Sequence, residues 1–282
     1  MLYKHKTYDE KYGFYNKAEK EGNTMSVKDD LGKRMKEFYE NVSKINLVRR
    51  MPVAIRLDGK AFHTFTKGFK KPFDEVLIQA MQKTMKYLCE NIQGCVIGYT
   101  QSDEITLILV DYKKLISSAW FDNEVQKICS ISASMATLEF NRRFSDCILT
   151  YLQTNNSDQK YGDTLIKAIN KGALFDSRVF NIPKEEVCNL LYWRQLDAIR
   201  NSIQMLGQSE FSHKELHNKS CNDIQDMLMI QKNINWNNLE TTKKRGSCCI
   251  RNKNEDKHGW IIDNEIPIFS KNRSYVEDLI VF

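Results

Sequence analysis

The spacing of apolar residues along the chain predicts short strands and amphipathic helices in alternation. β-Branched and aliphatic residues at 53–57 predict a strand that ends at an Asp-Gly pair. Apolar residues at helical spacing over 74–91 predict a helix, for which Asp74 is the expected N-cap. Two apolar runs, 95–99 and 104–110, flank a short polar turn and therefore predict a β-hairpin.

A long predicted helix over 120–144 and a strand over 175–182 complete this series. The order of elements is then β-α-β-β-α-β, the split βαβ arrangement of ferredoxin-like domains and polymerase palms. We therefore expect an α+β fold: a polymerase-like palm with a ferredoxin-like βαββαβ core and additional C-terminal helices. The polar segment 145–172 has no clear assignment, and its stretch 155–158 predicts a loop tip.

The chain divides into three predicted parts. These are an N-terminal extension at 1–24, the palm catalytic core at 25–182, and a helical C-terminal part at 183–282 packed on the core. Outside the core series, further patterns predict helices over 30–42, 185–206 and 221–230 and a late strand over 245–251.

The composition is typical of a soluble globular protein. Of the 282 residues, 41% are hydrophobic and 28% charged, and no apolar run approaches the roughly 20 residues that cross a bilayer. The N-terminal residues lack the apolar stretch of a secretory signal, so we expect no membrane partner. The eight cysteines include no Cys-x-x-Cys pair, which indicates buried thiols in a cytoplasmic protein, with neither disulfides nor a zinc site.

The formal net charge of +6 permits a nucleic-acid partner without demonstrating one. Basic residues gather in three places, which are Lys67, Lys70 and Lys71; Arg142 and Arg143; and Lys243, Lys244 and Arg245. For each cluster by itself, solvated surface charge is the competing interpretation.

Three carboxylates fall at one edge of the predicted sheet. Asp58 closes the first strand, while Asp103 and Glu104 lie at the tip of the hairpin, and the split βαβ topology places these strands side by side. No opposing cation is apparent at this edge, and clustered carboxylates are costly unless cations neutralise them. Two Mg²⁺ ions about 4 Å apart would do so and would suit phosphoryl transfer. Gly59, lacking a Cβ, would let its carbonyl approach a metal or phosphate.

Each motif also has a simpler interpretation, because Asp-Gly and Ser-Asp-Glu are both common in turns. Their joint placement on neighbouring strands favours the metal site. The sequence contains neither a P-loop nor a Rossmann glycine fingerprint. A triphosphate would therefore be bound by the metals, by the backbone after Asp58 and by cations such as Lys71, for which a free position on a solvated loop is the alternative.

Several ordered motifs resemble the histidine tRNA guanylyltransferase superfamily over roughly 30–254. They are RLDGKAFHTF at 56–65, Lys71-Pro72 with Asp74, QSDE at 101–104, FDSRV at 175–179, and WRQ at 193–195 with Asp197. The resemblance implies a palm that binds two Mg²⁺ through Asp58, the Gly59 carbonyl, Asp103 and Glu104. It also implies ATP and GTP as substrates, tRNA as partner and a homotetramer.

The resemblance further implies a reaction in steps, in which ATP adenylylates the 5′-monophosphate of a tRNA and the 3′-hydroxyl of an incoming nucleotide then attacks that phosphate. His63, Lys71 and Ser102 would assist activation and triphosphate binding. Further nucleotide contacts would come from Arg56, Lys60, Ala61, Phe62, Asp74, Asn201 and Lys219. RNA contacts would come from Arg142, Arg143, Arg194, Arg200, His213, Lys214, Lys243, Lys244 and Arg245.

Two histidine positions have competing interpretations. His63 stands between phenylalanines, so a buried structural histidine is the alternative to a catalytic one. His213 and His217 are one turn apart and superficially suggest zinc ligands, but the intervening Glu is misplaced for that motif and no third ligand is apparent. A surface or RNA contact is the favoured interpretation.

One stretch departs from the family pattern. Enzymes devoted to histidine tRNA carry HINNLYN after the WRQ motif, whereas 199–205 here is IRNSIQM, which keeps only Asn201 clearly. We therefore expect the branch that adds nucleotides by base pairing to 5′-truncated tRNAs, a 5′-end repair reaction. The alternatives are addition of G to histidine tRNA, a palm-type nucleotidyl cyclase, and an RNA-binding module without activity.

Overall fold

The computed structural model describes residues 24–154, 158–252 and 259–281. By contacts the chain forms two compact units, one ending at Ile45 and one from Asn46 onward. The predicted extension 1–24 lies outside the described residues except for Thr24, and the predicted boundaries after residues 24 and 182 stay predictions.

The first unit is helical where it is described. It contains α1 (Thr24–Met35), followed by the short turns η3 (Lys36–Glu40) and η4 (Asn41–Ser43). The predicted helix over 30–42 is therefore present and begins earlier than expected. Its apolar side chains, including Phe38 and Tyr39, are exposed.

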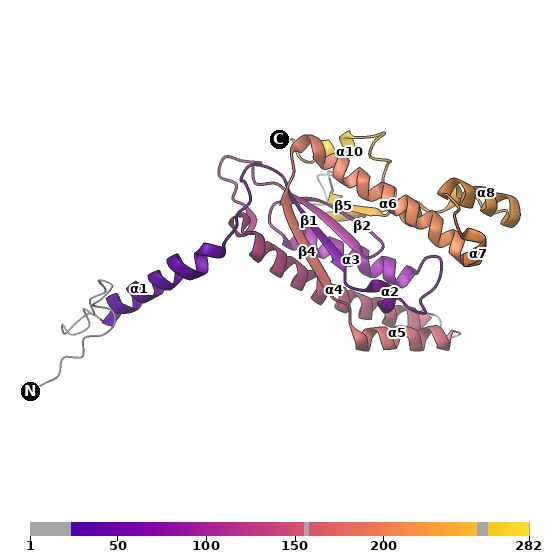
Figure 1. Cartoon of the computed structure of the whole chain (residues 1–282), viewed down its shortest axis with the longest axis horizontal. Helices are drawn as coiled ribbons and strands as arrows, with labels where there is room; N and C mark the ends of the chain where they lie inside the picture. Colours follow the sequence, from indigo (N-terminus) through magenta and orange to yellow (C-terminus); the bar gives the residue numbers. More distant parts are fainter. Residues whose placement is uncertain (1–23, 155–157, 253–258, 282) are drawn as a thin grey trace, which may run out of the picture. The chain divides into compact units, whose positions relative to one another are not determined.

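A six-stranded antiparallel sheet forms the centre of the second unit, with the order β4-β1-β3-β2-β5-β6 (Figure 1). Its strands are β1 (Val53–Gly59), β2 (Cys95–Gln101), β3 (Glu104–Leu109), β4 (Phe175–Asn181), β5 (Ser247–Arg251) and β6 (Trp260–Asp263). The first four have the ferredoxin-like order, and the fold class predicted from the sequence is confirmed. β5 and β6 extend the sheet beyond β2, and only the first of these two was predicted.

Helices cover both faces of this sheet. The helices and short helical turns of the second unit are α2 (Phe62–Phe65), α3 (Glu75–Asn91), η5 (Trp120–Asn123), α4 (Val125–Thr154), α5 (Gln159–Lys171), α6 (Lys184–Glu210), α7 (His213–Leu216), α8 (Cys221–Lys232), η6 (Trp236–Asn238), α9 (Thr241–Arg245) and α10 (Ser274–Glu277). The predicted helix over 120–144 starts five residues later and runs to Thr154, and most of the unassigned segment 145–172 is helical.

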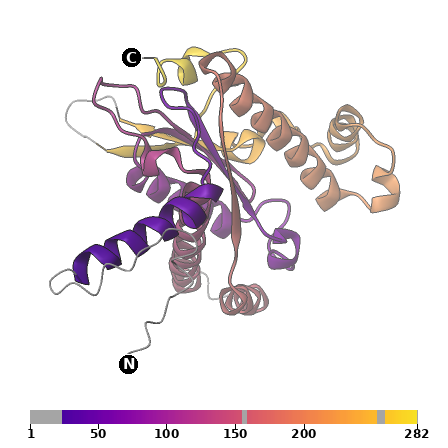
Figure 2. The same cartoon turned by 60° about the vertical axis from the view of Figure 1, so that its left-hand side comes forward.

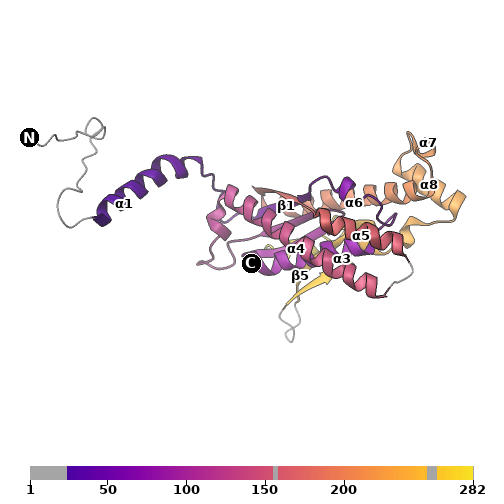
Figure 3. The same cartoon turned by 90° about the horizontal axis from the view of Figure 1, so that it is seen from below.

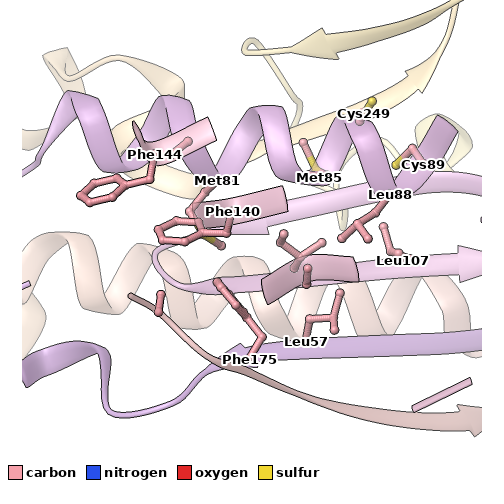
Figure 4. Packing of buried hydrophobic residues seen from close by; sticks show 14 of the residues in the cluster. Leu57, Met81, Met85, Leu88, Cys89, Leu107, Phe140, Phe144, Phe175 and Cys249 are labelled. Carbon is pink, nitrogen blue, oxygen red and sulfur yellow. The ribbon is translucent and has the colours of Figure 1, made fainter. Parts of the chain in front are cut away.

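One face of the sheet packs against α3 and α4, which Figure 3 shows on the same side with α5 beside them. Alternate β1 residues, such as Ile55 and Leu57, point into this layer because strand side chains alternate between faces. Figure 4 shows the aromatic rings of Phe140 and Phe144 from α4 and Phe175 from β4 among the buried side chains of this layer, beside α3. This core holds the ends of β1 and of the β2–β3 hairpin in place.

The other face packs against α6 and the C-terminal segment. Ala54 and Ile108 of the sheet join Val187 and Leu191 of α6 in a second buried cluster. The far end of α6 carries its own small core with α7 and α8, beyond the sheet (Figure 2). α6 therefore connects the sheet to this helical part.

Among the described residues, no helix has the length and apolar character that a membrane span requires. All eight cysteines are free thiols; the prediction of buried thiols is confirmed for six of them, while Cys129 and Cys221 are partly exposed.

Candidate active site

The structure brings Asp58 and Asp103 together at the edge of the sheet. Asp58 is the last residue but one of β1, and Asp103 lies in the two-residue connection between β2 and β3. The Gly59 amide donates a hydrogen bond to the Asp103 carbonyl at 3.1 Å, which fixes the two segments side by side. Two carboxylates distant in sequence thus share one site.

Both carboxylates are destabilised as anions. The pKa of Asp103 is raised to about 6, chiefly by burial and also by the nearby charges of Asp58 and Glu104, while a hydrogen bond from Ser102 opposes the shift. The pKa of Asp58 is raised by burial first and then by Glu104 and Asp176, with Arg178 opposing. A divalent cation between the two carboxylates would relieve this cost.

Glu104 contradicts its expected role as a metal ligand. One carboxylate oxygen accepts from Arg56 Nη2 at 3.0 Å, and the other accepts from Arg194 Nε at 2.9 Å and Gln101 Nε2 at 3.0 Å. The expectation that no cation faces this edge was also wrong, because Arg56 lies on the same strand as Asp58 and Arg194 comes from α6, which the βαββαβ series does not include. Glu104 is the anion of a largely buried ion network.

The remaining donors fit Mg²⁺. Among the described residues, no three His, Cys, Asp or Glu side chains are grouped to hold a metal. Asp58, Asp103 and the Gly59 carbonyl offer hard oxygen donors, and Mg²⁺ typically takes one or two carboxylates and keeps waters for its other positions. These three donors could hold Mg²⁺ without Glu104.

Gly59 is required by packing as well. A Cβ at this position would lie 2.2 Å from the Phe62 ring, so any side chain would displace that ring. Phe62 is buried and packs against Phe140 and Phe175 with ring centroids at 5.6 and 5.3 Å. The Phe62 side chain thus anchors the loop, whereas Lys60 and Ala61 are exposed beside the carboxylates.

A cleft of about 680 Å³ opens beside Asp103. It is lined by Gly59, Ala61, Phe62, His63, Thr66, Lys67, Gly68, Phe69, Lys70, Lys71, Pro72, Asp74, Leu77, Ser102, Asp103, Met205 and Gln208. His63 is exposed in this cleft, so the alternative of a buried structural histidine is wrong. Three lysines and a histidine facing one cleft form a cationic site suited to a triphosphate.

Asp74 joins the segments that form one wall of this cleft through its hydrogen bonds. It caps α3 by accepting from the Leu77 amide at 3.0 Å, as predicted, and it also accepts from the Lys70 amide at 3.0 Å and the Tyr161 hydroxyl at 2.5 Å. Its carboxylate is buried and accepts from these three donors. Asp74 therefore positions the loop that carries Lys70, and because it also lines the cleft, its expected contact with the nucleotide stays a prediction.

Asn201 and Lys219 do not line the cleft itself. Asn201 lines a pocket of about 90 Å³ that shares Ser102, Leu77 and Met205 with the cleft, so it is adjacent to the site. Lys219 lines a separate pocket of about 510 Å³ beside His213, near α7. This pocket shares Gln208 with the cleft, and the expected nucleotide contact by Lys219 stays a prediction.

Several predicted RNA contacts are instead paired within the protein. Arg194 is buried and bonded to Glu104 and Asp197, which contradicts an RNA contact through its guanidinium. The cluster at 243–245 is likewise engaged, through Lys243 to Glu75, Lys244 to the Asn237 carbonyl and Arg245 to the Ile266 carbonyl. Arg143 pairs with Glu139. The predicted contacts that remain exposed are Arg142, Arg200, His213 and Lys214.

Two residues of β4 were quoted in a motif but given no role. Asp176 lies opposite Asp58 in the strand register, and Arg178 lies opposite Arg56, so their side chains share the face that carries Asp58. Arg178 Nη2 is 3.9 Å from an Asp58 oxygen and 3.3 Å from Asp176. The signal in the sequence was the period-2 alternation of β4, read against the register with β1.

Comparisons with known proteins find one matching family model and several similar proteins. A family model described as "Thg1: tRNAHis guanylyltransferase" matches residues 32–183. An uncharacterized protein, R259, of Acanthamoeba polyphaga mimivirus is 31% identical over 91% of this chain and 89% of its own length. A bacterial tRNA(His) guanylyltransferase (Thg1)-like protein in complex with ATP is 45% identical, with a TM-score of 0.76 over 89% of this chain and 99% of that one. A bacterial Thg1-like protein in complex with GTP is 40% identical, with a TM-score of 0.72 over 90% and 100%.

Proposed function

This chain belongs to the Thg1 (tRNAHis guanylyltransferase) family of nucleotidyltransferases, and we propose from this membership that it joins nucleotides to the 5′ end of a tRNA. The observation that carries the proposal is the shared site of Asp58 and Asp103 at the mouth of a cationic cleft. Relatives of the same fold bind ATP and GTP, which supports both nucleotides as substrates.

The cleft supplies positioning and charge. Lys67, Lys71 and His63 line the space in which a triphosphate would lie, where the two ammonium groups would bind its phosphates and the imidazole could donate a hydrogen bond to them. Ser102 lines the same cleft beside Asp103 and can donate to a phosphate oxygen. Asp58, Asp103 and the Gly59 carbonyl would hold Mg²⁺, which supplies stabilisation of the charge that develops in phosphoryl transfer.

The proposed reaction consists of two successive steps at the same site, an adenylyl transfer and a nucleotide addition. In the first, the 5′-monophosphate of the tRNA attacks the α-phosphorus of ATP and pyrophosphate leaves. In the second, the 3′-hydroxyl of the incoming nucleotide attacks the activated 5′ phosphate and AMP leaves. No side chain of the site acts as a nucleophile, which agrees with a site built of carboxylates and cations.

Template-dependent extension of a 5′-truncated tRNA is the specific reaction we propose. Its support is the departure of 199–205 from the pattern of enzymes devoted to histidine tRNA. In this stretch Ile203 is buried in the core of the helical end of α6, and Met205 lines the cleft. In template-dependent extension a base pair with the template selects the incoming nucleotide, so the side chains of the histidine-tRNA pattern are not needed for that selection.

Addition of a single G to histidine tRNA is the second candidate, because the matching family model carries that description. The distinguishing experiment supplies Mg²⁺, ATP and each nucleoside triphosphate to 5′-monophosphorylated tRNAs, either intact or lacking their first nucleotide. Template-dependent repair predicts faster extension of the truncated tRNA, with the added nucleotide following the opposing base. Faster addition of G to intact histidine tRNA, whatever base opposes it, would establish the second candidate instead.

Cyclic or dinucleotide products from triphosphates alone would indicate a cyclase, and tight tRNA binding without turnover would indicate a binding module. A homotetramer and a cytoplasmic location stay predictions from the sequence.

A further inference from the structure

A half-exposed tryptophan lies above the ion network that joins α6 to the sheet. Trp193 has an exposed fraction of 52%, although large aromatic side chains are usually covered. The guanidinium carbons of Arg56 and Arg194 lie 5.1 and 4.5 Å from the centre of its ring system. Their side chains are only 14% and 7% exposed, so both cations lie beneath the indole and its outer surface is free.

This indole is close to the reacting carboxylates. Arg56, which it covers, is two residues before Asp58 on β1 and points to the same face of the sheet. Arg56 also bonds Glu104, the residue directly opposite Asp58 in the strand register. Trp193 therefore covers an arginine that shares the sheet face of Asp58.

The indole and the triphosphate cleft lie at different points along α6. Met205, which lines the cleft, follows Trp193 by about three turns, or about 18 Å along the helix axis. No residue of α6 before Met205 lines that cleft. The carboxylates are thus flanked by a cationic cleft on one side and by an aromatic surface on the other.

A transfer between two substrates needs both to reach the same carboxylates. If the triphosphate occupies the cationic cleft, the RNA end must approach from elsewhere, and the aromatic surface provides a contact that nucleobases favour. We propose that Trp193 stacks on a base at the 5′ region of the RNA substrate and so presents its terminal phosphate to Asp58. The proposal rests on the proposed function, because it assumes an RNA substrate.

Two neighbouring features fit an RNA strand at this place. Leu196 and Arg200 follow Trp193 at helical spacing and are exposed on the same face of α6.

Stacking, and not net charge, would provide the affinity. Exposed cations on this face are balanced by carboxylates, since Arg178 faces Asp58 and Asp176 and Arg200 faces Asp197. Loss of the indole should therefore weaken RNA binding without changing its salt dependence, because that dependence counts the phosphates neutralised by cations.

The test measures equilibrium binding of a 5′-monophosphorylated, truncated tRNA to the full-length chain, with ATP binding measured in parallel. We expect Trp193→Leu, which keeps an apolar cover over the arginines, to weaken tRNA binding about tenfold. Trp193→Phe, which keeps an aromatic face, should recover most of the affinity, and ATP affinity should stay at the wild-type value in both. Ile166→Ala, an exposed apolar change on α5, serves as the control.

Unchanged tRNA binding by Trp193→Leu overturns the proposal. Equal losses of tRNA and ATP affinity together with a lower melting temperature also overturn it, because they show that the indole only shields the ion network. The tRNA-binding and ATP-binding measurements are both independent of turnover. A wild-type protein that binds tRNA through Trp193 but fails to extend it would count against the proposed function and leave the stacking site standing.

Discussion

Asp58 and Glu104 lie directly opposite each other on neighbouring antiparallel strands, yet their carboxylates have different partners. Glu104 is held by two arginines and a glutamine, whereas the closest cation to Asp58 is Arg178 at 3.9 Å. Asp58 and its neighbour Asp103 therefore retain the capacity to bind a metal that Glu104 has lost to the ion network. The predictions below follow from this division of roles.

Glu104→Gln should destabilise the protein by about 3 kcal/mol, because it leaves Arg56 and Arg194 without their anion in a largely buried setting. Chemical denaturation measures this change. The control is Glu240→Gln, which removes an exposed partner of Lys243 and should cost less than about 1 kcal/mol. Our assignment of Glu104 would be wrong if its variant kept wild-type stability and instead lost affinity for Mn²⁺.

Asp103→Asn should stabilise the metal-free protein at neutral pH. The folded-state pKa of Asp103 is about 6, above its ordinary value of 3.8, so the native state holds the proton more tightly than the unfolded chain does. Stability therefore falls as the pH rises from about 4 to about 6 and stays lower above that range. In EDTA at neutral pH the variant should gain about 1–2 kcal/mol, since ionisation of a partly buried carboxylate no longer opposes folding.

The same pair of proteins tests the metal site through stability alone. Mg²⁺ should raise the melting temperature of the wild type, because it binds only the folded site, and should raise that of Asp103→Asn much less. Equal stabilisation of both proteins by Mg²⁺ would place the metal elsewhere.

Tyr161→Phe should weaken binding of the triphosphate through the loop that it supports. Its hydroxyl donates to Asp74, which also accepts from the Lys70 amide. The change therefore loosens the loop at Lys70 without altering a residue that lines the cleft. We expect a loss of about 1 kcal/mol in stability and a several-fold higher KM for ATP with nearly unchanged kcat. Tyr192→Phe, on the opposite face of the sheet, is the matched control. A change in kcat alone would contradict a positioning role.

The sequence predicts the central fold well because its strands and helices are strongly patterned. The aliphatic run at 53–57 and the hairpin at 95–110, placed in the βαββαβ series, predict the sheet order, and that order brings Asp58 to Asp103. The N-cap of α3 at Asp74 is likewise visible in the sequence. Local sequence patterns were enough to predict a contact wherever both of its residues lie within one element.

Contacts between distant elements were not predictable in this way. Arg194 reaches Glu104 from a helix 90 residues later, and nothing in the spacing of either residue indicates that pair. Similarly, the sequence pattern predicts Asp74 as a helix cap, and the family resemblance implies a nucleotide contact. Only the structure shows that its carboxylate also accepts from the Lys70 amide and the Tyr161 hydroxyl. Positions of charged residues indicate which groups are present, but tertiary packing decides which of them are neutralised.

The central claim is that Asp58 and Asp103 together support nucleotide transfer to the 5′ end of a tRNA. The most direct measurement is incorporation of a labelled nucleotide into a 5′-truncated tRNA by the wild type, Asp58→Asn, Asp103→Asn and the exposed control Asp163→Asn. We expect each of the first two variants to lose at least about 1000-fold in rate and Asp163→Asn to match the wild type. Wild-type rates in Asp58→Asn or Asp103→Asn would contradict the claim.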